Sequence, residues 1–372
     1  MTGTRITAIY HVTATAADIA ARAHDIAVEQ SVEMPVAAIT EAQVLNDVVG
    51  KVEAITDMGN GRFEVRIGLA TATFTTHAGP EPGQLMNMLF GNSSIHADMV
   101  LADVIFPAAV AEAFGGPRQG LAGLRARAGA HVRALTCSAL KPQGLAPRAL
   151  AAIAHELAAG ELDFLKDDHG LADQAFSPFA ERVPRVAEAV ASARRTGRTC
   201  YLPSLSGHLD QMRAQMEIVR AAGLDGVLIA PMIAGLATFH ALVRENPDIA
   251  FMAHPALAGA TAIAPPLLLG KIFRLLGADA SVFPNHGGRF GYSPDTCKAL
   301  ANDARWPWGE LKATIPVPAG GMNTARVGEM LGFYGPDVML LIGGALLAAG
   351  PNMRAQTAAF TAAVANWGNA HG

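Results

Sequence analysis

The sequence contains little charge, and charge of neither sign is concentrated in any region. Only 16% of its 372 residues are charged, the formal net charge is −4, and Lys and Arg form no dense run. Nucleic acids and anionic membrane surfaces are bound through concentrated positive charge. We therefore expect neither as a partner, and a small molecule is the favoured ligand.

Cysteines are also scarce, and long apolar runs are absent. Cys137, Cys200 and Cys297 lie in separate segments, with no spacing typical of a disulfide framework or a zinc knuckle, which favours a reducing compartment. No apolar run approaches the roughly 20 residues of a membrane-spanning helix. The first residues lack the pattern of a signal peptide. A cytoplasmic protein is therefore expected.

Hydrophobic residues, by contrast, make up 51% of the chain, enough for the cores of two domains. The first third of the chain has the periodicity of strand, helix, strand, strand, helix and strand in that order. The corresponding segments are 6–12, 16–29, 50–55, 62–69, 84–90 and 99–105. This order predicts a ferredoxin-like α+β domain over residues 1–106, followed by a Gly/Pro/Ala-rich linker with some helix at 107–129.

Residues 130–372 have a different pattern, in which a short apolar strand and an Ala-rich helix repeat about every 30 residues. The predicted strands are 132–138, 162–165, 199–202, 226–229, 250–253, 280–283, 314–317 and 338–342. Eight such units over about 240 residues match the size of a (β/α)8 TIM barrel. The predicted fold class is therefore α/β, with a C-terminal barrel after the ferredoxin-like domain. An open doubly wound sheet is the alternative, because periodicity cannot show that the ring closes.

Unusual polar residues and glycine pairs follow the predicted barrel strands. They are Lys141, the run Lys166-Asp167-Asp168-His169, His254, Asn285-His286, Gly320-Gly321 and Gly343-Gly344. The active site of a barrel enzyme lies at the C-terminal ends of its strands. We therefore predict that these residues converge on one site.

The run 163–169 carries the most chemical information. Burying several consecutive ionisable side chains is costly unless a cation or a substrate compensates their charge. Strand alternation puts Lys166 and Asp168 on one side, where a divalent ion would polarise a substrate carbonyl and stabilise an enediolate. The alternative is a surface turn with local pairing between Lys and Asp.

The other polar residues each have a functional and a structural interpretation. The two glycine pairs close the last two strands and predict a phosphate site made of backbone N–H groups, with ordinary turn chemistry as the alternative. His254 is a candidate proton shuttle or contact to a substrate hydroxyl, or else a structural residue. Lys141, taken alone, is typical of a surface lysine.

The segment 162–168 resembles the stretch of the ribulose-bisphosphate carboxylase large subunit in which a lysine carbamylated by CO2 binds Mg²⁺. Supporting matches follow in chain order: Glu29, Asn92, Lys141-Pro142 with Gly144-Leu145, His254, Ile315-Pro316-Val317 with Gly320-Gly321, and Gly343-Gly344. The resemblance extends from about residue 6 to residue 365. It implies that carbamylated Lys166 and Asp168 bind the metal, with Lys141 and His254 around the substrate.

The resemblance also implies a homodimer. In that family the small domain of one subunit covers the barrel of the other. Glu29 and Asn92 would thus reach the active site of the neighbouring subunit.

Several departures from the family pattern argue against carboxylation. His169 stands where a glutamate ligand is expected, which would weaken Mg²⁺ binding or favour Mn²⁺, unless His169 does not bind the metal. Arg289 replaces the lysine of the loop after the sixth strand, and a guanidinium is not equivalent to an ammonium. The residues that bind a second phosphate in the family are replaced here by Val282, Pro255 and Ala319. One contact to the first phosphate is replaced by Met34-Pro35.

These departures resemble the non-carboxylating RuBisCO-like proteins. The expected activity is metal-dependent enolisation of a monophosphorylated keto-sugar, with an enolase, isomerase, decarboxylase or transcarboxylase outcome. A Schiff-base aldolase that uses Lys141 or Lys166 is one alternative. A non-catalytic barrel that binds a sugar phosphate is the other.

Overall fold

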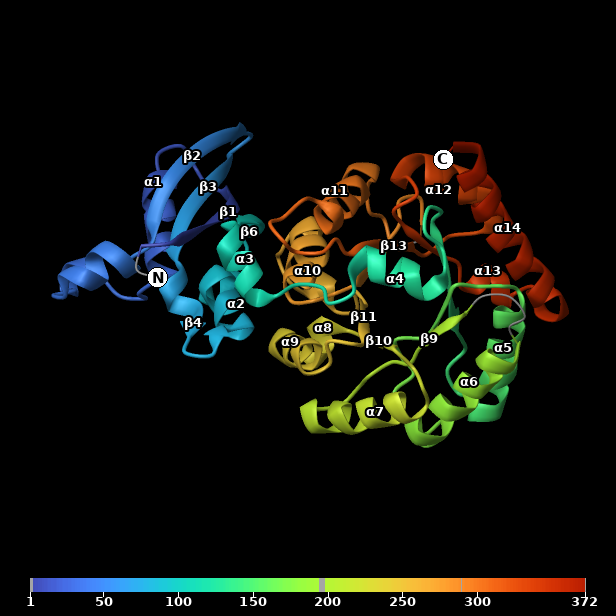
Figure 1. Cartoon of the computed structure of the whole chain (residues 1–372). Coiled ribbons are helices and arrows are strands. Elements are labelled where there is room, and N and C mark those ends of the chain that lie inside the picture. The colour runs from blue at the N-terminus through green and yellow to red at the C-terminus, as the bar shows by residue number, and fades with distance from the viewer. Residues whose placement is uncertain (1–2, 194–197, 289, 372) are drawn as a thin grey trace. The chain divides into compact units, whose positions relative to one another are not determined.

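The computed structural model describes residues 3–193, 198–288 and 290–371 and divides into two compact units (Figure 1). The N-terminal unit runs up to Gly115 and also contains the segments 258–268 and 308–311. The barrel unit contains the rest of the described chain. Among the described residues, no helix is both long enough and apolar enough to cross a bilayer.

The N-terminal unit is built on a four-stranded antiparallel sheet with the strand order β2-β3-β1-β6. Its main elements are β1 (Arg5–Thr13), α1 (Ile19–Glu29), β2 (Lys51–Gly59), β3 (Arg62–Ala70), α2 (Pro82–Phe90) and β6 (Met99–Ile105). Alternate residues of β1, from Ile6 through Tyr10 to Val12, are at most 1% exposed, and Tyr10 donates from Oη to the carbonyl of Leu89 in α2 (2.6 Å). The predicted ferredoxin-like order of elements is confirmed.

Smaller elements complete the N-terminal unit. They are β4 (Thr75–Thr76), β5 (Gly79–Pro80), α3 (Ala108–Phe114) and short helical turns at 36–38, 44–48, 71–74, 92–95 and 258–260. The segment 258–268 lies along the edge strand β6, because Leu101 exchanges backbone hydrogen bonds with Ala262 (3.0 Å) and Ala264 (2.9 Å). This pairing covers an edge that would otherwise present open backbone groups.

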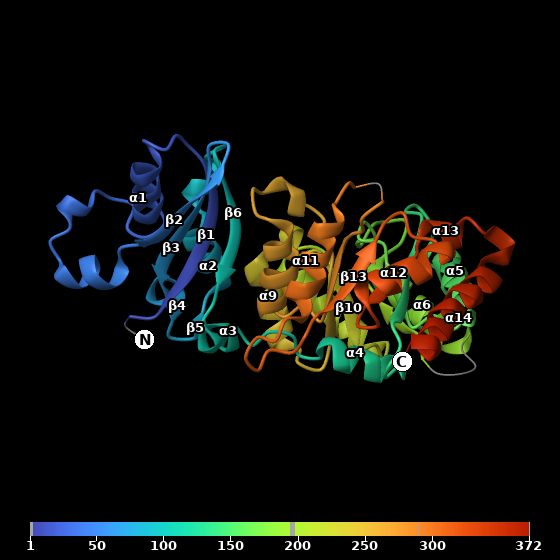
Figure 2. The same ribbon diagram turned by 90° about the horizontal axis from the view of Figure 1, so that it is seen from above.

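The described part of the barrel unit contains eight parallel strands, with helices surrounding them in both views (Figures 1 and 2). The strands are β7 (Leu135–Leu140), β8 (Phe164–Asp167), β9 (Cys200–Leu202), β10 (Gly226–Ile229), β11 (Ala250–Ala253), β12 (Ala280–Pro284), β13 (Ile315–Ala319) and β14 (Met339–Leu341). Each predicted strand is present, with its start displaced by at most three residues.

The strands close into a ring. Hydrogen-bonded ladders join β14-β7-β8-β9 and β10-β11-β12-β13. Leu228 links the two ladders through hydrogen bonds with Pro203 (2.9 Å) and Leu205 (2.8 Å), and β13 lies beside β14. The barrel prediction is confirmed, and the alternative of an open sheet is wrong.

The barrel helices alternate with the strands. They are α4 (Gly120–Ala128), α5 (Pro147–Ala159), α6 (Phe179–Ala193), α7 (Leu209–Ala221), α8 (Pro231–Ala234), α9 (Leu236–Glu245), α10 (Phe273–Leu275), α11 (Pro294–Arg305), α12 (Val327–Tyr334), α13 (Gly344–Leu347) and α14 (Met353–His371). Shorter helical turns occupy 266–272, 324–326 and 350–352.

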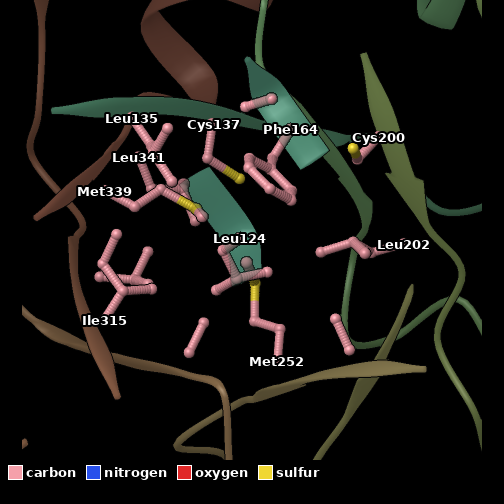
Figure 3. Packing of buried hydrophobic residues seen from close by; sticks show 14 of the residues in the cluster. Leu124, Leu135, Cys137, Phe164, Cys200, Leu202, Met252, Ile315, Met339 and Leu341 are labelled. Atoms are coloured by element: carbon pink, nitrogen blue, oxygen red, sulfur yellow. The ribbon is translucent and has the colours of Figure 1, made fainter. Parts of the chain in front are cut away.

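Side chains from every strand fill the barrel interior, together with Leu124 of α4 (Figure 3). Leu124 is 2% exposed and lies among Leu135, Met252 and Ile315 in this view. Asp279, at the start of β12, holds α4 in place by accepting hydrogen bonds from the backbone N–H groups of Gln119 and Gly120, both at 2.7 Å. Part of the stretch 107–129 therefore belongs to the barrel core.

We predict that Asp279→Asn destabilises the protein by about 3 kcal/mol, because an amide cannot accept from all the backbone donors that face the buried carboxylate. Asp279 also accepts from the N–H of Phe251 (2.8 Å). Urea unfolding followed by circular dichroism measures the loss. The exposed Asp295→Asn is the matched control and should change stability by less than about 0.5 kcal/mol. Equal stability of the two variants would contradict the anchoring role.

Candidate active site

Two acidic residues stand at the end of β8: Asp167 is its last residue, Asp168 follows directly, and their side chains make separate contacts. Asp167 is fully buried and accepts hydrogen bonds from Tyr201 Oη (2.8 Å), Ser204 N (3.1 Å) and Arg182 Nε (3.3 Å). Asp168 makes its contacts elsewhere and is 7% exposed. The alternation predicted for this strand is confirmed, and the alternative of a surface turn is wrong because Lys166, Asp167 and Asp168 are buried.

Asp168 is the centre of an ionic cluster. Lys141 Nζ, after β7, donates to its Oδ1 at 2.7 Å, and His169 Nδ1 lies 3.2 Å from the same oxygen. Burial alone would raise the pKa of Asp168, but the hydrogen bonds from His169 and Lys141 outweigh burial and hold this pKa well below its usual value. Asp168 therefore stays ionised. Lys141, which had no partner visible in the sequence, is its main counter-ion.

Lys166 is a buried amine, 3% exposed, at the same end of β8. Its Nζ donates to the carbonyl of Asp167 (3.0 Å). Burial lowers the pKa of Lys166, although the neighbouring Cys137 and Asp168 act in the opposite direction. A lower pKa increases the fraction of neutral amine, which is the form that reacts with CO2 or with a carbonyl.

His254, after β11, joins this cluster through His169. The two imidazole rings are stacked, with their centroids 4.1 Å apart and their planes inclined by 10°. Nδ1 of His254 accepts from the backbone N–H of Ala256 (3.1 Å), which leaves Nε2 to carry the proton. Burial lowers the pKa of His254 to about 2, with Lys166 and His169 adding to the effect. His254 is thus a neutral imidazole that can donate a hydrogen bond through Nε2.

The side chains of the cluster can hold a divalent ion only if Lys166 is modified. Among the described residues, no group of three or more His, Cys, Asp and Glu side chains is arranged to bind a metal. Asp168 offers one carboxylate and His169 one imidazole. A carbamate on Lys166 would add the second anionic oxygen donor, so this donor set fits Mg²⁺ or Mn²⁺ only in the carbamylated state.

Both predicted glycine pairs follow neighbouring strands. Gly320 and Gly321, after β13, have φ values of 84° and 69°, a left-handed conformation that glycine adopts without strain. Gly343 and Gly344, after β14, are open, because an added Cβ would meet no atom within 4 Å. The Gly343-Gly344 turn can therefore be approached closely by a ligand, whereas Gly288 packs against the Gly320-Gly321 turn. Their role in phosphate binding stays a prediction.

Glu29 and Asn92 lie together in the N-terminal unit. Asn92 Nδ2 donates to Glu29 Oε1 (2.9 Å) and also to Glu33 Oε1 (3.0 Å). These residues line a polar pocket of about 230 Å³. Sequence reasoning did not single out Glu33, whose left-handed backbone (φ 55°) has no signal in the sequence. The predicted substrate contact Arg289 lies outside the described residues.

Comparison with known proteins places these residues in a family. The model of the ribulose bisphosphate carboxylase large chain, catalytic domain, matches residues 120–368. The chain is 60% identical to a 5-methylthioribulose-1-phosphate isomerase of Rhodospirillum rubrum, over 97% of this chain and 96% of that protein. It is 31% identical to a 2,3-diketo-5-methylthiopentyl-1-phosphate enolase of Geobacillus kaustophilus, over 82% and 78% of the two chains.

A crystal structure of a Rubisco-like protein from Rhodopseudomonas palustris matches with a TM-score of 0.90. The two chains are 55% identical, and the match covers 98% of each. The shared fold thus extends over both units of this chain.

The Asp168 cluster generates a prediction about protonation. Replacing Lys141 by Met removes a cation at 2.7 Å, so the pKa of Asp168 should rise by about one pH unit or more. Carboxyl ¹³C chemical shifts followed during an acid titration measure this change. Lys51→Met, at an exposed position of β2, is the control and should leave the pKa of Asp168 unchanged. An unchanged pKa in Lys141→Met would contradict the ion pair.

Proposed function

Because the chain belongs to the RuBisCO-like branch of the ribulose bisphosphate carboxylase large-chain family, we propose that it isomerises 5-methylthioribulose 1-phosphate. The observation that carries this proposal is the 60% identity, over nearly the whole length of both chains, to the relative with that name. Such a substrate is a ketopentose with one phosphate. It agrees with the single phosphate site expected from the glycine pairs.

The cluster after β7, β8 and β11 suits the isomerisation of a ketose. That reaction removes a proton from the carbon next to a carbonyl and returns a proton to another atom. We assign the first step to Lys166, which would accept the proton through its carbamate. Its burial at 3% exposure excludes water, so that the proton is passed to the substrate instead of being lost to solvent.

His254 is the proposed donor to the substrate oxygen. Its Nδ1 is occupied by the N–H of Ala256, so only Nε2 can donate. The ring is held in place by stacking on His169. A neutral donor fixed in this way stabilises the negative charge that develops on the oxygen of an enediolate. Lys141 supplies positive charge beside Asp168 and is the second candidate to move a proton.

A divalent ion, Mg²⁺ or Mn²⁺, would be held by Asp168 and carbamylated Lys166, with His169 as a further candidate ligand. When bound, such an ion polarises a carbonyl group and lowers the pKa of the neighbouring C–H. The ionised state of Asp168 suits this role, since its pKa lies far below neutrality.

The phosphate would bind at the turns Gly320-Gly321 and Gly343-Gly344. Backbone N–H groups of such glycine turns bind a phosphate in many barrels after the seventh and eighth strands. β13 and β14 hold these positions in this ring.

We further propose a homodimer in which the N-terminal unit of one subunit completes the active site of the other. Glu29 and Asn92 are hydrogen-bonded to each other in their own polar pocket, as a pair that acts together would be. The exposed Asn92 amide, which donates to both Glu29 and Glu33, would keep the two carboxylates oriented.

The proposal predicts isomerisation of 5-methylthioribulose 1-phosphate in the presence of Mg²⁺ and bicarbonate, with activity lost on treatment with a chelator. Lys166→Met should lower kcat/KM by about 10³-fold or more, because it removes the base. Lys51→Met is the matched control and should retain activity. Reaction in D2O, followed by ³¹P and ¹H NMR, detects the product and shows whether the transferred hydrogen is retained, as the buried base predicts, or exchanged with solvent.

Other outcomes of this assay select other functions. Deuterium exchange without an isomerised product indicates an enolase. Activity that survives the chelator and is trapped by borohydride indicates the Schiff-base alternative, for which the buried amine of Lys166 is suited. Binding without product and without exchange indicates a non-catalytic barrel.

The shared active site predicts complementation between two inactive variants. Glu29→Gln damages the N-terminal unit and Lys166→Met the barrel, so a mixed dimer keeps one intact site. Random reassembly of equal amounts should restore about one quarter of wild-type activity. A mixture of Lys166→Met with Asp168→Asn is the control, since both variants damage the barrel and no intact site can form. Recovery in neither mixture would exclude a shared site.

A further inference from the structure

A buried amide follows β12 and has unusual partners. Asn285 is fully buried, and its Oδ1 accepts from Tyr334 Oη at 2.6 Å. Its Nδ2 donates to the sulfur atoms of Met330 (2.9 Å) and Met322 (3.3 Å). The amide therefore connects β12 to α12 and to the loop after β13.

The two methionine sulfurs are weak partners for the buried amide of Asn285. A thioether sulfur is a weak acceptor, so the Asn285 amide loses more on leaving water than two methionines return. An aliphatic side chain would pack against Met322 and Met330 without that cost, but it would remove the acceptor of the buried Tyr334 hydroxyl. The strong bond of this amide is therefore the one from Tyr334, which joins the loop after β12 to the end of α12.

Asn285 is also joined directly to the Gly320-Gly321 turn. Its backbone N–H donates to the carbonyl of Ala319 (2.8 Å), the residue before that turn. Three residues later, Gly288 packs against the turn itself. A Cβ on Gly288 would lie 2.6 Å from the carbonyl oxygen of Gly320, and a Cβ on Gly321 would lie 2.9 Å from Gly288 Cα. The loop 285–288 and the Gly320-Gly321 turn are thus packed directly against each other.

Tyr334, the last residue of α12, is well suited to hold this arrangement. It is 2% exposed, and its ring packs edge-on against Phe283 and Phe333. Arg305 donates to its carbonyl at 2.9 Å. Burial raises the pKa of Tyr334, so the hydroxyl stays protonated and remains a donor to Asn285.

We propose that Tyr334 and Asn285 are positioning residues for the turn Gly320-Gly321, which they hold in the conformation that binds a phosphate monoester. Tyr334 orients the Asn285 amide, Asn285 fixes the loop 285–288, and Gly288 sets the position of the turn. This inference rests on the proposed phosphate site, but it does not depend on which reaction follows.

The test is Tyr334→Phe, which removes one hydroxyl and keeps the ring. Calorimetric titration with inorganic phosphate measures the site without turnover. The Kd for phosphate should rise about tenfold, which corresponds to about 1.4 kcal/mol. In the isomerase assay, KM should rise by a similar factor while kcat changes by less than about threefold, because the reacting groups at β8 and β11 are not touched.

Thr314→Val is the matched control. Thr314 is also fully buried, and its hydroxyl donates to the carbonyl of Ala278 at 2.6 Å, at the other end of β13. It should lower stability as Tyr334→Phe does, but leave the Kd for phosphate and KM unchanged. Asn285→Leu is the second positioning variant. The double variant, Asn285→Leu with Tyr334→Phe, should bind phosphate no more weakly than the weaker of the two single variants. The reason is that both residues act on the turn through the same contacts.

The outcomes separate this inference from the proposed function. A tenfold loss of phosphate affinity in a protein that does not isomerise the substrate supports the positioning role and overturns only the proposed reaction. Wild-type protein that binds no phosphate in the millimolar range overturns the positioning role. So does a Tyr334→Phe variant that loses stability but keeps the wild-type Kd and KM.

Discussion

The structure depends on how the charge at the end of β8 is compensated. Two adjacent carboxylates leave this strand, and each is buried. Because strand geometry sends them to opposite sides, they draw on separate partners: Asp167 is bound by Arg182 and Tyr201, whereas Asp168 is bound by Lys141 and His169. The first set fixes the strand. The second leaves a charged cluster at the end of β8, where the proposed chemistry occurs.

His169 shows why one departure from the family pattern is accommodated. An imidazole can stack on His254, with centroids 4.1 Å apart, whereas the expected glutamate could not. The ring also remains within 3.2 Å of Asp168. Where the resemblance implies an anionic ligand, the chain thus has a ring that packs against the ring of His254. Such a site agrees with the proposed isomerisation, which adds no carboxylate.

The barrel and its site were predictable to different degrees. Apolar strands at regular intervals predicted all eight barrel strands, and residues just past strand ends predicted the cluster, because both follow from local pattern. Long-range partners were not predictable. Lys141 has no visible partner in the sequence, yet it pairs with Asp168 across 27 positions. The partnership of Asn285 with Tyr334, 49 positions apart, likewise depends on the folded ring.

The position of Leu124 limits where the chain can be cut to obtain a stable barrel fragment. Its side chain fills the barrel interior, although it lies before the first barrel strand. A recombinant fragment that began at residue 130 would keep all eight strands but lose the side chain at the centre of the ring. Excision at that point would leave a hollow of the size of a leucine, which typically costs about 2–5 kcal/mol. A barrel fragment that folds on its own must therefore retain α4, together with the Asp279 contact that anchors it.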